Sequence, residues 1–269
     1  MEAFFLPRES GQRFCLFHPA RDYKARGAVI YVHPFAEEMN KARRMAALQA
    51  RAMANAGFDV LQIDLLGCGD SSGDFSDATW QAWNDDILAG YLWLRTRSQA
   101  PLTLWGLRAG CLLATNAADK LTEQANFIFW QPVISGKQHW QQFMRLKMAG
   151  GLTSGSAKGV SEGIKQHLAA GQTVEIAGYS ISPLLAGSLE KAELEMPDVH
   201  PGRVIWLELS TRDDVILAPL SQKRVEEWQV SGINVEAKIV RGPGFWQTTE
   251  IEDAPELIAA TMSALESRQ

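Results

Sequence analysis

The stretch LTLWGLRAG, residues 102–110, decides the fold that this sequence predicts. Its first five residues form a short apolar run typical of a buried strand, and residues 109–121 continue with a helical pattern. Gly106 and Gly110 flank Arg108, and glycines at these two positions permit a tight turn in which larger side chains would collide. The sequence therefore predicts that Arg108 stands at the tip of a sharp strand-to-helix turn.

Short β-rich runs alternate with amphipathic segments on both sides of this turn. Further strands are predicted at residues 28–33, 59–67, 126–133, 203–210 and 233–240. Further helices are predicted at residues 41–57, 77–97 (with Asp77 as its N-cap), about 217–230 and 255–266. Residues 2–6 and 13–18 read as an antiparallel hairpin at the N-terminus. Strands that are apolar on both faces and separated by helices predict an α/β fold, with a mostly parallel central sheet and helices on both faces.

Residues 134–200 interrupt this alternation with two helical patches, around 137–149 and 161–170, and with glycines that include Gly150, Gly151, Gly155, Gly159 and Gly163. We interpret them as a small cap inserted over the carboxyl ends of the strands, where open α/β sheets bind ligands. The chain is then one domain, residues 1–269, that contains the cap. His139 and His167 fall on the cap helices; we expect both at the surface, and a position leaning into the pocket is the alternative for either.

Composition narrows the function classes. The formal net charge of −5 gives no bulk attraction to nucleic acid, and the longest apolar runs are too short to span a bilayer. The cysteines are odd in number and lack a CxxC pair, and the five histidines lack zinc-ligand spacing. The first residues show no signal-peptide pattern. We therefore expect a cytoplasmic protein with reduced thiols, no metal and no cofactor, and the composition leaves its oligomeric state open.

Five segments occur in the order found in one large superfamily. The GxRxG spacing of residues 106–110 matches the nucleophile elbow GxSxG, and HPF at 33–35 resembles the segment that supplies an oxyanion-hole amide. GCGDSSG at 67–73 resembles the glycine-rich turn after the following strand. STRDDV at 210–215 and GPGFW at 242–246 stand where the triad-acid and triad-histidine loops belong. Over nearly its whole length, the chain resembles the α/β-hydrolase superfamily.

Three longer strings resemble a narrower group, the exosortase A system-associated hydrolases of the second type. They are YVHPFAEEMNKARR at 31–44, LLGCGDSSGDF at 65–75 and LWGLRAG at 104–110. Bacteria encode this group beside exosortase and exopolysaccharide genes. The resemblance implies a hydrolase or acyl-transfer relative that acts on an ester, a thioester or an acylated saccharide.

The sequence departs from the superfamily pattern at the residues that carry the chemistry. Arg108 stands where the serine belongs, and Phe245 and Trp246 stand where the histidine belongs. A guanidinium has no lone pair for attack on a carbonyl, whereas the covalent route needs a hydroxyl beside an imidazole. Only the acid position is retained, as Asp214 or as its neighbour Asp213. We therefore do not expect acyl-enzyme chemistry.

A site still remains in this prediction. The backbone N–H groups of Phe35 and Ala109 are expected to converge as in an oxyanion hole, and the following helix directs its positive end to the same place. Arg108 adds a full positive charge, so we expect an anion there, from a ligand or from the protein itself. The internal candidates are Asp213, Asp214, Glu208, Glu37 and Glu38.

Two functions stay open on the sequence alone. In the first, a water activated by Glu37, Glu38 or Asp214 hydrolyses an acyl substrate while Arg108 holds an oxyanion or an anionic group. In the second, the chain is a non-catalytic pseudo-hydrolase that binds an anionic or saccharide ligand or a partner protein. The remaining candidate pocket residues are His33, Asp213, Phe245 and Trp246, of which the last two either fill the pocket or stack on a ligand ring.

Overall fold

The computed structural model describes residues 1–21, 24–150, 157–197, 201–212 and 216–267. The strands of its main sheet are β1 (Glu2–Arg8), β2 (Gly11–His18), β3 (Gly27–Val32), β4 (Phe58–Ile63), β5 (Leu102–Leu107), β6 (Ala125–Trp130), β9 (Val204–Ser210) and β10 (Val235–Arg241). They lie in the order β1-β2-β4-β3-β5-β6-β9-β10. The six strands from β4 to β10 in this order pair in parallel, whereas β1 with β2 and β2 with β4 pair antiparallel. The predicted α/β-hydrolase fold is confirmed.

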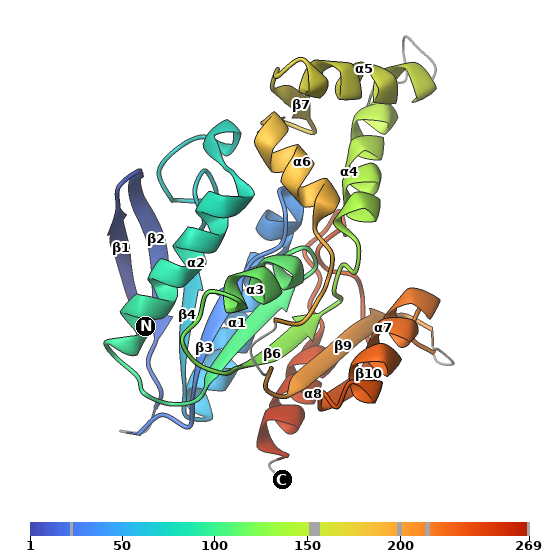
Figure 1. Ribbon diagram of the computed structural model, residues 1–269. Coiled ribbons are helices and arrows are strands. Elements are labelled where there is room, and N and C mark those ends of the chain that lie inside the picture. The colour runs from blue at the N-terminus through green and yellow to red at the C-terminus, as the bar shows by residue number, and fades with distance from the viewer. Residues whose placement is uncertain (22–23, 151–156, 198–200, 213–215, 268–269) are drawn as a thin grey trace.

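Helices cover both faces of this sheet (Figure 1). They are α1 (Glu37–Asn55), α2 (Trp80–Arg95), α3 (Gly110–Ala118), α7 (Pro219–Val230) and α8 (Pro255–Glu266). Successive side chains of a strand point to opposite faces. Tyr31 and Trp105 accordingly pack in the core under α1 and α8, while Ile30 and Leu104 pack under α2, α3 and α7. This two-sided burial explains why the central strands are mostly apolar on both faces.

The chain leaves the sheet after β6 and returns to it at β9. The segment between holds α4 (Gly136–Gly150), α5 (Ala157–Ala169), β7 (Val174–Ile176), β8 (Tyr179–Ile181) and α6 (Pro183–Lys191). Figure 1 shows these elements projecting beyond the sheet at the end where α3 begins. The hairpin β7–β8 and helix α6 were not predicted, and the cap over residues 134–200 stays a prediction as a structural unit.

The prediction that Asp77 caps the helix after β4 is wrong. Helix α2 begins at Trp80, and the Thr79 hydroxyl accepts the N–H of Ala82 at 3.0 Å. Asp77 instead accepts the N–H of Asp74 at 2.8 Å and closes a 3₁₀ turn before the helix. Both residue types cap helices well, so only the path of the chain decides between them.

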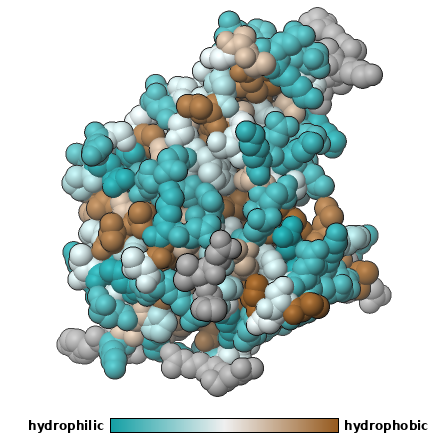
Figure 2. Space-filling view, viewed as in Figure 1, coloured by the Kyte–Doolittle hydropathy of each residue, from teal (hydrophilic) through white to brown (hydrophobic). Residues whose placement is uncertain are grey.

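The surface in Figure 2 is covered mostly by hydrophilic residues, with hydrophobic residues in small separate patches. Within the described part of the chain, no helix has the length and apolar character needed to cross a membrane.

Candidate functional site

The turn between β5 and α3 projects Arg108 above the sheet. Arg108 has a φ of +55°, a left-handed conformation that a non-glycine residue rarely adopts. A Cβ at Gly106 would lie 2.7 Å from Cys111 Cα, and one at Gly110 would lie 2.3 Å from the carbonyl oxygen of Val32. Both glycines are therefore needed, because they allow α3 to start tightly against β5 and against the end of β3. The geometry matches the sharp turn predicted from the sequence.

Of the three candidate carboxylates that the structure describes, Glu37, Glu38 and Glu208, Arg108 pairs with Glu38. Arg108 Nε donates to Glu38 Oε1 at 3.1 Å, and the two side chains are 16% and 20% exposed. This is the one hydrogen bond that the Arg108 guanidinium makes with another described residue. Its guanidinium carbon also lies 5.4 Å from the centroid of the Trp246 ring, in a cation–π contact. Glu208 instead accepts from the indole N–H of Trp206 at 2.9 Å.

The segment after β3 carries Glu38 to this place. His33 is fully buried; Nδ1 donates to the Pro34 carbonyl oxygen at 2.8 Å, and Nε2 accepts the N–H of Leu65 at 3.3 Å. Burial lowers the pKa of His33, so the ring is neutral and both its nitrogens are used by the backbone. His33 thus holds the segment in place and does not line the cavity beside Arg108. Ala36 follows with a φ of +50°, directly before α1.

The two predicted oxyanion-type amides belong to the segments that meet here. Neither the Phe35 N–H nor the Ala109 N–H donates a hydrogen bond to another described residue. The close approach of Gly110 to the backbone of Val32 and His33 brings the two segments together. Both amides therefore retain the capacity to donate to a ligand oxygen.

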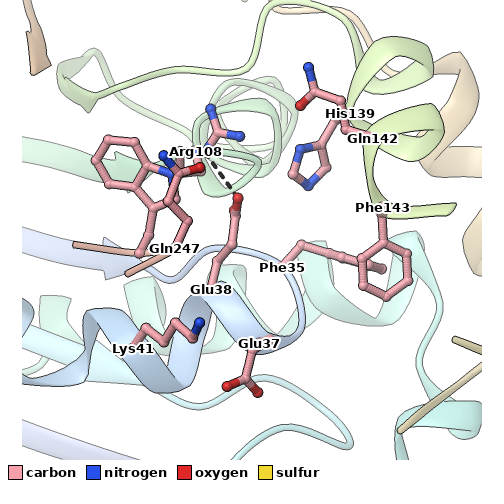
Figure 3. A pocket seen from close by; sticks show the side chains of 10 residues that line it. Phe35, Glu37, Glu38, Lys41, Arg108, His139, Gln142, Phe143 and Gln247 are labelled. Atoms are coloured by element: carbon pink, nitrogen blue, oxygen red, sulfur yellow. Dashed lines mark hydrogen bonds and ion pairs between the residues drawn. The ribbon is translucent and has the colours of Figure 1, made fainter. Parts of the chain in front are cut away.

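A cavity of about 210 Å³ lies between α1, the Arg108 turn and α4 (Figure 3). It is lined by Phe35, Glu37, Glu38, Lys41, Arg108, His139, Gln142, Phe143, Trp246 and Gln247. Two carboxylates and two cations stand beside three aromatic rings in this set. In Figure 3 the Arg108 guanidinium, the Glu38 carboxylate and the His139 ring converge on the same space.

His139 lines the cavity, which is the alternative position that the sequence left open for it, and not the surface position expected. Its side chain is 5% exposed rather than at the surface, and neither ring nitrogen has a hydrogen-bond partner. Burial lowers its pKa to about 4, with Glu38 raising and Arg108 lowering it, so the ring is neutral at pH 7. The overlooked signal is helical spacing, because Trp140, Phe143 and Met144 share the buried side of α4 with His139. By contrast, His167 is exposed, as predicted.

Unsatisfied polar atoms concentrate at this cavity. In the described part of the protein, nine buried side-chain nitrogen and oxygen atoms lack a hydrogen-bond partner. Four of them belong to three cavity residues, namely Glu38 Oε2, both ring nitrogens of His139, and Trp246 Nε1. Buried polar groups are normally hydrogen-bonded, so such a cluster marks a place with capacity left for a ligand.

The other candidates take different positions. Phe245 is 1% exposed and packs on Trp130, 6.2 Å between ring centroids, in the core under α1 and α8. Trp246 does line the cavity. Glu37 stands at the mouth, where it accepts from the Tyr179 hydroxyl at 3.1 Å. Asp213 and Asp214 lie outside the described residues.

No alternative nucleophile or metal centre emerges from the described residues. The Cys111 thiol is fully buried, and burial raises its pKa well above the ordinary value. Nor does any group of three or more His, Cys, Asp or Glu side chains in the described ranges come close enough together to hold a metal ion.

The sheet order, the Arg108 turn and the cavity above it define an α/β-hydrolase. Residues 23–190 match the family described as serine aminopeptidase, S33, and the chain belongs to this family.

Individual proteins match this chain either over part of its length or at low sequence identity. A stretch of 111 residues is 32% identical to human protein ABHD12B and covers 41% of this chain but 29% of that protein. Among solved structures, Est1E from Butyrivibrio proteoclasticus with bound ferulic acid has a TM-score of 0.65 at 14% identity, covering 99% of this chain and 100% of its own. A soluble variant of monoglyceride lipase from Saccharomyces cerevisiae has a TM-score of 0.61 at 15% identity, covering 98% and 94%. At these identities the likeness of the two structures shows the fold alone.

Proposed function

We propose that this chain binds a small acyl or saccharide compound in the cavity beside Arg108 and forms no covalent acyl intermediate. One observation carries the proposal. The described residues that line the cavity include no serine, threonine, cysteine or tyrosine, and the turn that would present a nucleophile presents a paired guanidinium. The free amides, the neutral imidazole and the aromatic walls supply binding groups without the hydroxyl or thiol that forms the acyl-enzyme in the superfamily route.

The loop after β10 supports the same conclusion. The superfamily route needs an imidazole beside the nucleophile, and this loop offers Phe245, buried in the core, and Trp246, which stacks on Arg108. Both triad positions are thus replaced by residues that pack. We propose that Asp214, if it faces the site, acts as an additional charged neighbour of Arg108.

The biological setting follows from sequence resemblance. The three strings shared with exosortase A system-associated hydrolases support a bacterial protein of an exopolysaccharide system, in the cytoplasm. An acylated saccharide or a partner enzyme of that system is the ligand this setting favours.

A second function has a specific observation in its favour. Glu38 Oε2 is buried without a partner beside Arg108, so this carboxylate has an oxygen available to accept a proton from a water molecule. The Phe35 and Ala109 amides would then stabilise the oxyanion formed on an ester. In this alternative, the chain hydrolyses its ligand without an acyl-enzyme.

Thermal unfolding with p-nitrophenyl butyrate, an acetylated hexose and a short-chain acyl thioester tests the proposal. A binder at 100 times its Kd adds about 2.7 kcal/mol to the free energy of unfolding, which raises Tm by about 5 °C or more. We expect at least one compound to do so and to be recovered unchanged. Arg108→Met should abolish the shift, while Arg44→Met should retain it, because Arg44 pairs with Asp253 outside the cavity.

Other outcomes separate the alternatives. Turnover that disappears in Glu38→Gln would replace binding by water-mediated hydrolysis. A covalent adduct with a fluorophosphonate probe would overturn both functions, and the absence of any shift with all three compounds would overturn the binding proposal.

A further inference from the structure

The hydrogen-bonding capacity left at the cavity restricts what the ligand can be. His139 is 95% removed from solvent, yet both of its ring nitrogens lack partners, and the Glu38 carboxylate oxygen Oε2 shares this condition. A buried polar group without a partner costs free energy, because it has lost its hydrogen bonds to water. The fold gains nothing from leaving these atoms together, whereas a ligand that hydrogen-bonds to them recovers that free energy on binding.

The charges around the cavity oppose a charged ligand. Glu37 and Glu38 are matched by Lys41 and Arg108, and the neutral His139 adds none. A ligand carboxylate that approached Arg108 would also face Glu38 Oε2, while the guanidinium is already shared with Glu38 Oε1. Removing a charge from water without a full partner is unfavourable. The sequence predicted an anion beside Arg108, either from a ligand or from the protein. Glu38 is that anion, so the ligand does not need to supply one.

The polar atoms instead require a ligand with both a donor and an acceptor. An ionised carboxylate only accepts, so Glu38 Oε2 needs an O–H or N–H from the ligand. A neutral imidazole offers one N–H donor and one acceptor nitrogen, so His139 can donate to a carbonyl oxygen. The rings of Phe35, Phe143 and Trp246 supply apolar walls for a flat or ring-bearing body.

We infer that the cavity selects an uncharged acyl compound that carries a hydroxyl group. The hydroxyl donates to Glu38 Oε2, and the acyl carbonyl oxygen accepts from His139 and from the Phe35 or Ala109 amide. This inference rests on the proposed binding function and narrows its ligand class, with Glu38 and His139 as the residues that determine specificity.

Three closely related probes, of which the second and third each differ from the first by a methyl group, test it by titration calorimetry at pH 6.5. Methyl 4-hydroxybenzoate has a ring, an ester and a hydroxyl donor. Methyl 4-methoxybenzoate lacks the donor, and 4-hydroxybenzoate carries a carboxylate in place of the ester. We expect the first to bind at least about 10-fold more tightly than each of the others, since a hydrogen bond to a charged group is lost in one and a buried charge is added in the other.

Variants assign the preference to residues. Glu38→Gln leaves the cavity with an excess positive charge, so the carboxylate probe should gain about 10-fold and the hydroxyl preference should vanish. His139→Phe should weaken methyl 4-hydroxybenzoate about 10-fold. His167→Phe is the matched control, because His167 is an exposed histidine on α5, and it should leave all three affinities unchanged.

The wild-type series alone can overturn the inference, whether or not a variant folds. Equal binding of the hydroxyl and methoxy esters, or tighter binding of the carboxylate, would refute the specificity and leave the binding function standing. If none of the three probes binds but a compound of the thermal unfolding test does, the specificity is refuted and the binding function stands. Failure of both sets would overturn the inference together with the proposed function.

Discussion

Two arginine–carboxylate pairs in this molecule look alike by charge and differ in hydrogen bonding. Arg13 and Asp86 are each 1% exposed and meet at 2.6 Å, and Asp86 also accepts the N–H of Leu66 at 2.9 Å. Arg13 donates further to the hydroxyl and the carbonyl oxygen of Ser10. At the cavity, Arg108 and Glu38 share one hydrogen bond of 3.1 Å, and Glu38 Oε2 has no partner.

The difference distinguishes a pair that builds the fold from a pair that forms a site. Arg13 on β2 and Asp86 on α2 use most of their hydrogen-bonding capacity to tie the antiparallel edge of the sheet to a helix. Arg108 and Glu38 tie α1 to the strand-to-helix turn and retain capacity directed into a cavity. Asp86 also has a second arginine nearby, with Arg8 Nε at 3.4 Å, but the number of hydrogen bonds is the clearer distinction between the two roles.

The largest expected loss of stability comes from removing Asp86, the carboxylate of the pair that builds the fold. Asp86→Ala leaves the Arg13 guanidinium buried without a counter-charge, which should lower the free energy of unfolding by about 3–5 kcal/mol. Glu38→Ala should cost about 1 kcal/mol, because Arg108 keeps its contact with Trp246 and partial access to water. Urea unfolding at pH 7 measures both. Equal losses would mean that the two pairs have the same role.

The next largest effect is a pH dependence of stability that arises from His139 in the cavity. His139 has a folded-state pKa of about 4, below its ordinary 6.5, mainly because of burial. As the pH falls from 6.5 to 4, the unfolded state takes up the proton first, so stability is lost through this window. The shift corresponds to about 3 kcal/mol.

The measurement compares wild type with His139→Gln in urea unfolding at several pH values. Subtracting the variant's profile removes the contributions of the other histidines, and the difference should fall between pH 6.5 and pH 4. Parallel profiles would show that the ring is solvated rather than buried beside Arg108 and Glu38.

The fold could be predicted from sequence because its signals are local. The LTLWGLRAG stretch carries its strand, its glycines and its turn within nine residues. Most of the remaining main-sheet strands have a contiguous apolar run, and β10 shows an alternating pattern. The cap was harder. Strands β7 and β8 have three residues each, too few to show an alternating pattern. Asp77 and Thr79 are both good caps, and only the chain path selects Thr79.

The site could be predicted in part. Arg108 and the need for an acidic partner follow from the turn and from the cost of burying a charge, but the choice of Glu38 among five carboxylates depends on where α1 packs. The surface was expected for His139, because the helical spacing that it shares with Trp140 and Phe143 does not show which part of the fold packs on that side of α4. Its burial depends on the aromatic cluster with Phe35 and Phe143, which lie far apart in the sequence.

The smallest expected loss of stability concerns Tyr179 at the mouth of the cavity. We compare it with Tyr91, a buried tyrosine far from the cavity. The Tyr179 hydroxyl donates to Glu37 Oε2 at 3.1 Å and accepts from Asn40 Nδ2 at 3.0 Å, linking the hairpin β7–β8 to the first turn of α1. Tyr179→Phe should lower stability by about 0.5 kcal/mol, because both contacts are exposed to water. It should nevertheless increase amide exchange in β7 and β8.

Tyr91→Phe is the matched control, because the buried Tyr91 hydroxyl donates to Glu123 at 2.8 Å, far from the cavity. Tyr91→Phe should lower the free energy of unfolding by about 1–2 kcal/mol, because it removes a donor from a Glu123 oxygen that is less exposed to water than the Glu37 oxygen. It should leave amide exchange in the hairpin β7–β8 unchanged. Faster exchange in Tyr179→Phe alone would show that the hydroxyl holds the hairpin over the cavity entrance. Unchanged exchange in both variants would assign the hairpin's position to the contact of the Tyr179 ring with Phe75, whose centroids lie 5.0 Å apart.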